Sequence, residues 1–191
     1  ISTGVGGGVI IEDRLLQGHH GLAAELGHVT VDANPSAPVC GCGFRGHLEA
    51  FSSGTGIEHF VADELAAGHA SSLTGRPSAR EIADAANAGD ALARQAYARA
   101  GEYLGVGVAN FLHIFDPSIV IFGGGVSMSG PLLFEPFEAS LKKNIFHPRY
   151  LEGLVIAKAE LGDDGGDVCG RCHERHLDGG ARHCDDAGKN R

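Results

Sequence analysis

Apolar side chains recur at helical spacing in four stretches of this chain, which span residues 49–67, 78–88, 90–116 and 131–144. Ser78 is followed three residues later by Glu81, which is the pattern of a helix-capping box. Asp90 is a suitable cap for the long third helix, and Pro117 should end it. The pattern therefore predicts four helices whose boundaries are encoded locally.

Shorter apolar runs predict strands at residues 118–122 and 154–157. The run 118–122 has no polar interruption after its serine, so we expect it to be buried on both faces of a partly parallel sheet. The opening residues 1–11 predict two strands joined by a glycine turn. This order of helices and strands indicates the α/β fold class.

Length and charge limit the classes of partner. The 191 residues, 43% of them hydrophobic, can bury one substantial core. A formal net charge of −9 disfavours nucleic acid and anionic membranes as partners. No membrane-spanning run or signal-peptide pattern is present, so we expect a cytoplasmic location. The chain also opens in mid-strand without a methionine, and we expect it to be a fragment.

A cluster of metal ligands follows the first strands. Cys40 and Cys42 are separated by one glycine, His47 lies five residues later, and His28 precedes them by twelve. Two thiols and two imidazoles are a ligand set that suits tetrahedral zinc. The spacing is not that of a standard zinc finger. A bound zinc ion could position a loop that binds a ligand, or it could stabilise the loop without any role in ligand binding.

Two carboxylates, Glu25 and Glu49, flank this cluster. Carboxylates held rigidly on such a loop can accept hydrogen bonds from several hydroxyls at once, and sugars are common ligands of that kind. The residues therefore predict a carbohydrate site, with a purely structural metal loop as the alternative.

Two glycine-rich segments are candidates for phosphate or nucleotide contact. Residues 4–8 contain four glycines that permit positive φ angles, and Ser2 and Thr3 add hydroxyl donors. The alternative is a tight hairpin in which the glycines only turn the chain. Gly123, Gly124 and Gly125 follow a predicted strand, at the end where ligands bind in open α/β sheets, although packing explains them equally well.

Gly105 and Gly107 lie inside the predicted long helix, where each costs about 1 kcal/mol relative to alanine. Close approach of a ligand or backbone, or simple tight packing, would justify them.

From residue 163 onward the sequence has no isoleucine, phenylalanine, tyrosine or tryptophan, but it has three of the five cysteines. We hypothesise an altered reading frame from about residue 166, giving an aberrant and disordered tail over 166–191. Within it, Cys169, Cys172 and His173 have the spacing of a c-type haem site, although adventitious metal binding is the better interpretation.

Four motifs in this order resemble the ROK family of bacterial sugar kinases and related repressors, over residues 1–165. They are Thr3–Gly8, Glu25–His28, Cys40–Glu49 and Phe122–Val126. The resemblance implies the second, C-terminal lobe of a ribonuclease-H-like fold of the actin-like ATPase superfamily, with a zinc-binding loop. For the glucokinase branch it implies ATP-dependent phosphorylation of the glucose 6-hydroxyl in glycolysis.

The resemblance also implies roles for individual residues. Sugar hydroxyls would be bound by Glu25, His28 and Glu49. Mg-ATP would be bound by Thr3, Gly4, Gly6, Gly7, Gly123, Gly124 and Gly125. Structural zinc would be bound by His28, Cys40, Cys42 and His47, although most relatives have a third cysteine at position 47. Imidazole carries no charge and is longer than a thiolate side chain, so the affinity for metal could fall.

The first-lobe motifs of the family are absent, including the one with the catalytic aspartate. We therefore expect no catalytic base in this chain and no kinase activity from it alone. The runner-up function is the sugar-sensing domain of a ROK repressor, which a preceding DNA-binding segment would distinguish. The resemblance further implies a homodimer or homotetramer.

Overall fold

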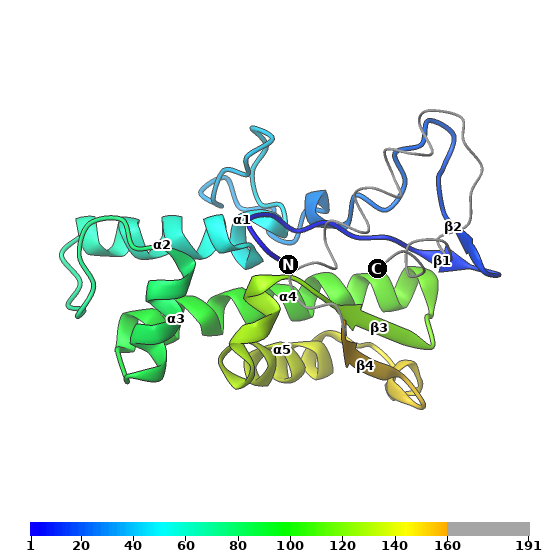
Figure 1. Cartoon of the computed structure of the whole chain (residues 1–191). Helices are drawn as coiled ribbons and strands as arrows, with labels where there is room; N and C mark the ends of the chain where they lie inside the picture. Colours follow the sequence, from blue (N-terminus) through cyan, green and yellow to red (C-terminus); the bar gives the residue numbers. More distant parts are fainter. Residues whose placement is uncertain (160–191) are drawn as a thin grey trace, which may run out of the picture.

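The computed structural model describes residues 1–159. Its helices are α1 (Glu49–Ser52), α2 (Gly54–Ala66), α3 (Ala79–Asn87), α4 (Ala91–Phe115) and α5 (Pro131–Asn144), with short 3-10 helices η1 (Leu26–His28), η2 (Gly125–Ser129) and η3 (Pro148–Leu151) (Figure 1). Its strands are β1 (Ile10–Ile11), β2 (Arg14–Leu15), β3 (Ile119–Phe122) and β4 (Val155–Lys158). The tail predicted over 166–191, with its cysteines, lies outside the described residues.

The long helix α4 forms the centre of the domain, with α5 on one side of it and α1 and α2 on the other (Figure 1). Leu104, Val108 and Leu112 of α4 are buried in one core together with Leu133 and Phe137 of α5. As predicted, the carboxylate of Asp90 caps α4, accepting a hydrogen bond from the backbone N–H of Ala93 at 2.9 Å. Asp116 ends it in a left-handed conformation ahead of Pro117.

Close packing explains the glycines inside α4. A Cβ at Gly105 would lie 2.5 Å from the Cβ of Ser140 and 2.7 Å from the backbone nitrogen of Leu141. A Cβ at Gly107 would lie 2.7 Å from the side chain of Leu48. The residues at these two positions have to be small because α5 and the start of α1 pack directly on the α4 backbone. The tight-packing interpretation is therefore confirmed.

The stretch 49–67 forms two helices, where the sequence predicted one. Ser53 is extended, with φ −80° and ψ 164°, and its side chain accepts a hydrogen bond from the backbone N–H of Gly56. The serine thus caps a new helix, α2, instead of continuing α1. The capping box at Ser78 and Glu81 is present as predicted.

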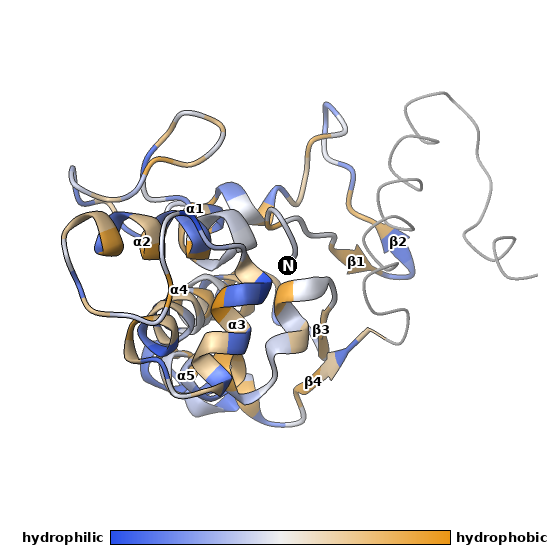
Figure 2. Cartoon of the chain, turned by 60° about the vertical axis from the view of Figure 1, so that its left-hand side comes forward, coloured by the Kyte–Doolittle hydropathy of each residue, from blue (hydrophilic) through white to orange (hydrophobic). Residues whose placement is uncertain are grey.

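The strands differ from the prediction in two respects. β3 and β4 pair in parallel, with Ile119 opposite Val155, but Ile119 and Ile121 are 46% and 60% exposed. The expectation of burial on both faces is therefore wrong within residues 1–159, because β3 has one neighbouring strand there and little covers its outer side. Figure 2 shows this apolar β-sheet at the surface, at the same end of the domain as the β1–β2 hairpin.

The hairpin lies farther along the chain than predicted. β1 and β2 pair antiparallel, and Glu12 and Asp13 form the turn with φ angles of 52° and 59°. Gly4, Gly6, Gly7 and Gly8 have no positive φ angles, so they form no left-handed cradle, and the turn of the hairpin lies at Glu12 and Asp13 instead. Among the described residues, no helix is long and apolar enough to cross a membrane.

Candidate functional site

The predicted metal ligands converge in one cluster. One ligand atom from each of His28, Cys40, Cys42 and His47 lies within 4.8 Å of all the others. Cys40 Sγ is 3.7 Å from His28 Nδ1, and Cys42 Sγ is 3.2 Å from His47 Nδ1. Tetrahedral zinc with ordinary bond lengths places sulfur and nitrogen ligands about 3.6 Å apart. The four side chains therefore fit a zinc ion.

The local fold of the loop explains this convergence. Short antiparallel bridges join Thr30 to His47 and Val39 to Arg45, closing the loop beneath the cysteines. Gly43 and Gly46 have φ angles of 91° and 74°, which side chains rarely adopt. At Gly46 a Cβ would also collide with the carbonyl of Asp32. These two glycines thus let the loop turn back and bring its ligands together.

The first cysteine is buried, and the second is exposed. Burial raises the pKa of the Cys40 thiol to about 11, assisted by a hydrogen bond and charge repulsion from Glu49. Zinc binds the thiolate, so a metal ion at this position must displace that proton. Tyr103 of α4 also contacts the loop, since its hydroxyl donates a hydrogen bond to the carboxylate of Asp32 at 3.2 Å.

Glu49 connects this loop to the first glycine segment. Its Oε2 accepts a hydrogen bond from the backbone N–H of Val5 at 3.0 Å, and the Cys40 thiol donates to its Oε1 at 3.3 Å. A Cβ at Gly4 would lie 2.6 Å from Oε2. A side chain at position 4 would therefore require the Glu49 carboxylate to shift, whereas the φ angle of Gly4 is not in the positive range.

The other two residues predicted to bind sugar are exposed. His28 belongs to the metal cluster and is exposed. Glu25 precedes η1 and is also exposed, with its carbonyl accepting a hydrogen bond from the backbone N–H of His28. Its carboxylate lies outside the lining of the hollow beside Glu49.

That hollow has a volume of about 1150 Å³ and lies between the metal loop and α2. Thr3, Gly4 and Glu49 line it, as do Ser53 and Thr55 at the start of α2. The other predicted ATP-binding glycines (Gly6, Gly7, Gly123, Gly124 and Gly125) do not line it.

The structure nevertheless brings the two glycine segments together. The N-terminal nitrogen of Ile1 donates to the carbonyl of Gly123, and the carbonyl of Ile1 accepts from Val126 at 3.1 Å. Gly124 has a φ angle of 88°, and a Cβ there would meet the backbone of Ile1. The residue that begins the first segment therefore contacts the second glycine segment through its backbone.

Sequence reasoning missed the start of α2. The backbone N–H of Gly54 donates to the carbonyl of Ser2 at 2.8 Å, and that of Thr55 donates to Thr3 at 3.3 Å. This contact holds the first glycine segment against the N-terminus of α2. The signal was present in the sequence, because Ser53 followed by Gly54 and Gly56 is a helix start that allows close backbone approach.

These features define a mixed α/β protein with the actin-like ATPase fold and a zinc-type histidine–cysteine loop. The model of the ROK family matches residues 1–171, and the chain belongs to that family.

Known relatives include kinases and regulators. The chain is 39% identical over 172 residues to a glucokinase of Thermotoga maritima, covering 87% of this chain and 53% of the relative. It is 32% identical to a xylose repressor of Caldicellulosiruptor bescii, covering 85% and 41%. The chain spans about half the length of the curated glucokinases it matches.

Solved structures agree with this grouping. A ROK family glucokinase of Streptomyces griseus, in complex with glucose and AMPPNP, has a TM-score of 0.73 and 31% identity, covering 87% of this chain and 55% of its own. A ROK hexokinase of Thermus thermophilus has a TM-score of 0.71 and 34% identity, covering 87% and 53%. The predicted family and fold are thereby confirmed.

Proposed function

We propose that this chain is the second-lobe part of an ATP-dependent sugar kinase of the glucokinase type, which phosphorylates the 6-hydroxyl of glucose. The observation that carries the proposal is the position of Glu49, which contacts both the backbone of the first glycine segment and the metal loop. The Streptomyces griseus relative was solved with glucose and a nucleotide analogue, which supports the same pair of ligands here.

In this proposal each group has a definite task. The carboxylates of Glu25 and Glu49 accept hydrogen bonds from sugar hydroxyls, and His28 adds an imidazole nitrogen. Backbone N–H groups of the glycine segments at 3–7 and 123–125 face the phosphates of Mg-ATP. A zinc ion on His28, Cys40, Cys42 and His47 would fix the loop that begins α1, and so fix the orientation of Glu49.

The proposal assigns no catalytic base to this chain. Phosphoryl transfer requires a carboxylate that orients the attacking hydroxyl, and the family motif that carries it is absent from this sequence. We infer that the 191-residue chain binds sugar without turning it over, and that activity requires the other lobe.

A sugar-sensing regulator is the second candidate. The observation in its favour is the 32% identity to a xylose repressor, together with a transcriptional regulator structure that has a TM-score of 0.71 and 32% identity. Both functions use the same sugar site, so they differ in the response to nucleotide.

Calorimetric titration of the zinc-loaded chain with glucose, and then with AMPPNP, tests the proposal. We expect saturable binding of both, and loss of at least about tenfold in glucose affinity for Glu49→Gln, because a charged hydrogen bond contributes about 1.5–3 kcal/mol. Glu135→Gln, an exposed carboxylate on α5, is the matched control and should leave glucose binding unchanged. Glucose binding without AMPPNP binding would favour the regulator, and no glucose binding would overturn both candidates.

A further inference from the structure

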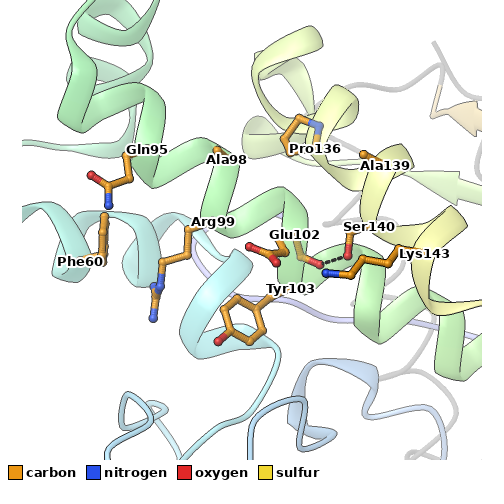
Figure 3. A pocket seen from close by; sticks show the side chains of 10 residues that line it. All are labelled: Phe60, Gln95, Ala98, Arg99, Glu102, Tyr103, Pro136, Ala139, Ser140 and Lys143. Carbon is orange, nitrogen blue, oxygen red and sulfur yellow. Dashed lines mark hydrogen bonds between the residues drawn. The ribbon is translucent and has the colours of Figure 1, made fainter.

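A second hollow, of about 600 Å³, lies on the outer side of α4 between α2 and α5. Figure 3 shows its lining, with Phe60 from α2, Arg99 and Glu102 from α4, and Lys143 from α5. We call this the α4–α5 groove. None of the residues assigned above to sugar, ATP or metal lines it.

Arg99 is the central feature of the groove. Its guanidinium carbon lies 4.6 Å from the ring centroid of Phe51, 4.7 Å from that of Phe60 and 5.6 Å from that of Tyr103. Aromatic faces stabilise a cation but accept no conventional hydrogen bonds from the N–H groups at the edge of its plane. Over residues 1–159 the guanidinium makes no hydrogen bond or ion pair.

This arrangement leaves a partly desolvated cation without a contacting anion. Burial lowers the pKa of Arg99, while the nearby charges of Asp32 and Glu64 act in the opposite direction without forming an ion pair. An arginine removed from water is stabilised when a carboxylate or phosphate takes its donors. Arg99 lines both this groove and the larger hollow.

The groove is locally positive on a strongly acidic chain. Arg99 and Lys143 line it against a single carboxylate, Glu102, whereas the chain as a whole has a formal net charge of −9. Lys143 is exposed and forms no ion pair in the described part of the chain. Its neighbour Lys142, by contrast, pairs with Glu138 at 3.8 Å.

We propose that the α4–α5 groove binds a small phosphate dianion, either inorganic phosphate or a phosphate monoester, on Arg99 and Lys143. The planar fork of arginine donors matches phosphate oxygens, and a lysine ammonium adds a second positive charge. A volume of about 600 Å³ accommodates a ligand as large as a phosphorylated hexose. Arg99 also lines the larger hollow with Thr3, Gly4 and Glu49, whereas Lys143 lines the α4–α5 groove alone, so Lys143 is the residue that distinguishes the two sites.

The test is calorimetric titration of the 191-residue chain with sodium phosphate and with glucose 6-phosphate, at constant ionic strength set by chloride. We expect saturable binding that weakens about threefold in Lys143→Gln, as for an exposed charge pair. Arg99→Gln should weaken it at least about tenfold, as for a charged hydrogen bond. Equal affinity for both ligands would indicate that the phosphate group alone is recognised. Tighter binding of glucose 6-phosphate that Lys143→Gln weakens and Glu49→Gln leaves unchanged would indicate a sugar subsite within the groove, whereas the reverse pattern would place this ligand in the proposed sugar site.

Lys142→Gln is the matched control, because it removes the same charge from the next position of α5 without touching the groove. It should bind phosphate like the unchanged chain. The proposal fails if phosphate does not bind, or if Lys143→Gln and Lys142→Gln have equal effects. It also fails if binding is lost in variants of the glycine segment 3–7 and kept in Arg99→Gln, since phosphate then occupies the nucleotide site. If Arg99→Gln does not fold, the comparison of phosphate affinity between Lys143→Gln and Lys142→Gln decides whether the proposal holds.

Discussion

The carboxylate of Glu49 accepts a hydrogen bond from the backbone N–H of Val5 at 3.0 Å, although the two residues lie 44 positions apart in the chain. Val5 is buried, and Glu49 begins α1 directly after the metal loop. The contact therefore joins a segment proposed to face nucleotide phosphates to a loop proposed to hold zinc and sugar.

Gly4→Ala should displace the Glu49 carboxylate, because the added Cβ would lie 2.6 Å from Oε2. We expect glucose affinity, measured by calorimetry, to fall severalfold while the zinc content stays unchanged. Gly6→Ala is the matched control, since a Cβ at that position has nothing within 4 Å. Equal glucose affinities for the two variants would show that close approach at position 4 does not orient Glu49.

His47→Ala should weaken metal binding, since it removes one of four ligands that lie within 4.8 Å of one another. His47→Cys should tighten it, because a third thiolate adds negative charge to a site of two thiolates and two neutral imidazoles. The measurement is a competitive zinc titration, together with the absorption bands of the cobalt-loaded chain, which report tetrahedral coordination and the number of thiolates. His20→Ala, at an exposed position outside the cluster, is the control. Unchanged zinc affinity in His47→Ala would remove His47 from the ligand set.

Gly105→Ala should destabilise the domain even though alanine is the better helix former. Alanine gains about 1 kcal/mol of helix propensity over glycine, but overpacking typically costs about 1–3 kcal/mol. Here the new Cβ would lie 2.7 Å from the backbone of Leu141, which cannot move without shifting α5. Urea unfolding should show a net loss of up to about 2 kcal/mol. Asn110→Ala, at an exposed position of α4, should instead leave stability unchanged or slightly higher.

Local signals predicted the helix boundaries well. Ser78 and Glu81 form the predicted capping box, and α5 spans Pro131–Asn144 as expected. The capping box depends on side chains that hydrogen-bond within one turn, and α5 begins at Pro131, a residue that suits the first turn of a helix, so a short window of sequence contains the information in both cases. The ligand cluster was predictable for the same reason, because three of its four members lie within eight residues.

Features that depend on tertiary contact were not predictable. The packing of Gly54 against Ser2 requires knowledge that two distant segments meet, although the helix start at Ser53 is itself a local signal. The exposure of Ile121 could not be read from an apolar run, because the same run suits a strand covered on one face or on both. The contact of Glu49 with Val5 has no local signature at all, although both residues lie in motifs that the sequence identified.

Asp90 should make the stability of the domain depend on pH. Its carboxylate accepts hydrogen bonds from Ala93 in α4 and from the backbone and hydroxyl of Ser72, and these bonds hold its pKa well below the usual range. A carboxyl whose pKa is lower in the folded state contributes stability above its unfolded pKa of about 3.9, and loses it as the pH falls toward the folded value. We expect Asp90→Ala to cost about 0.5–2 kcal/mol in urea unfolding at pH 7, as for other helix caps. The difference between the two proteins should shrink below about pH 4. Asp84→Asn, at an exposed position of α3, should show no such pH-dependent difference, and a gap for Asp90→Ala that stays constant down to pH 2 would contradict this account.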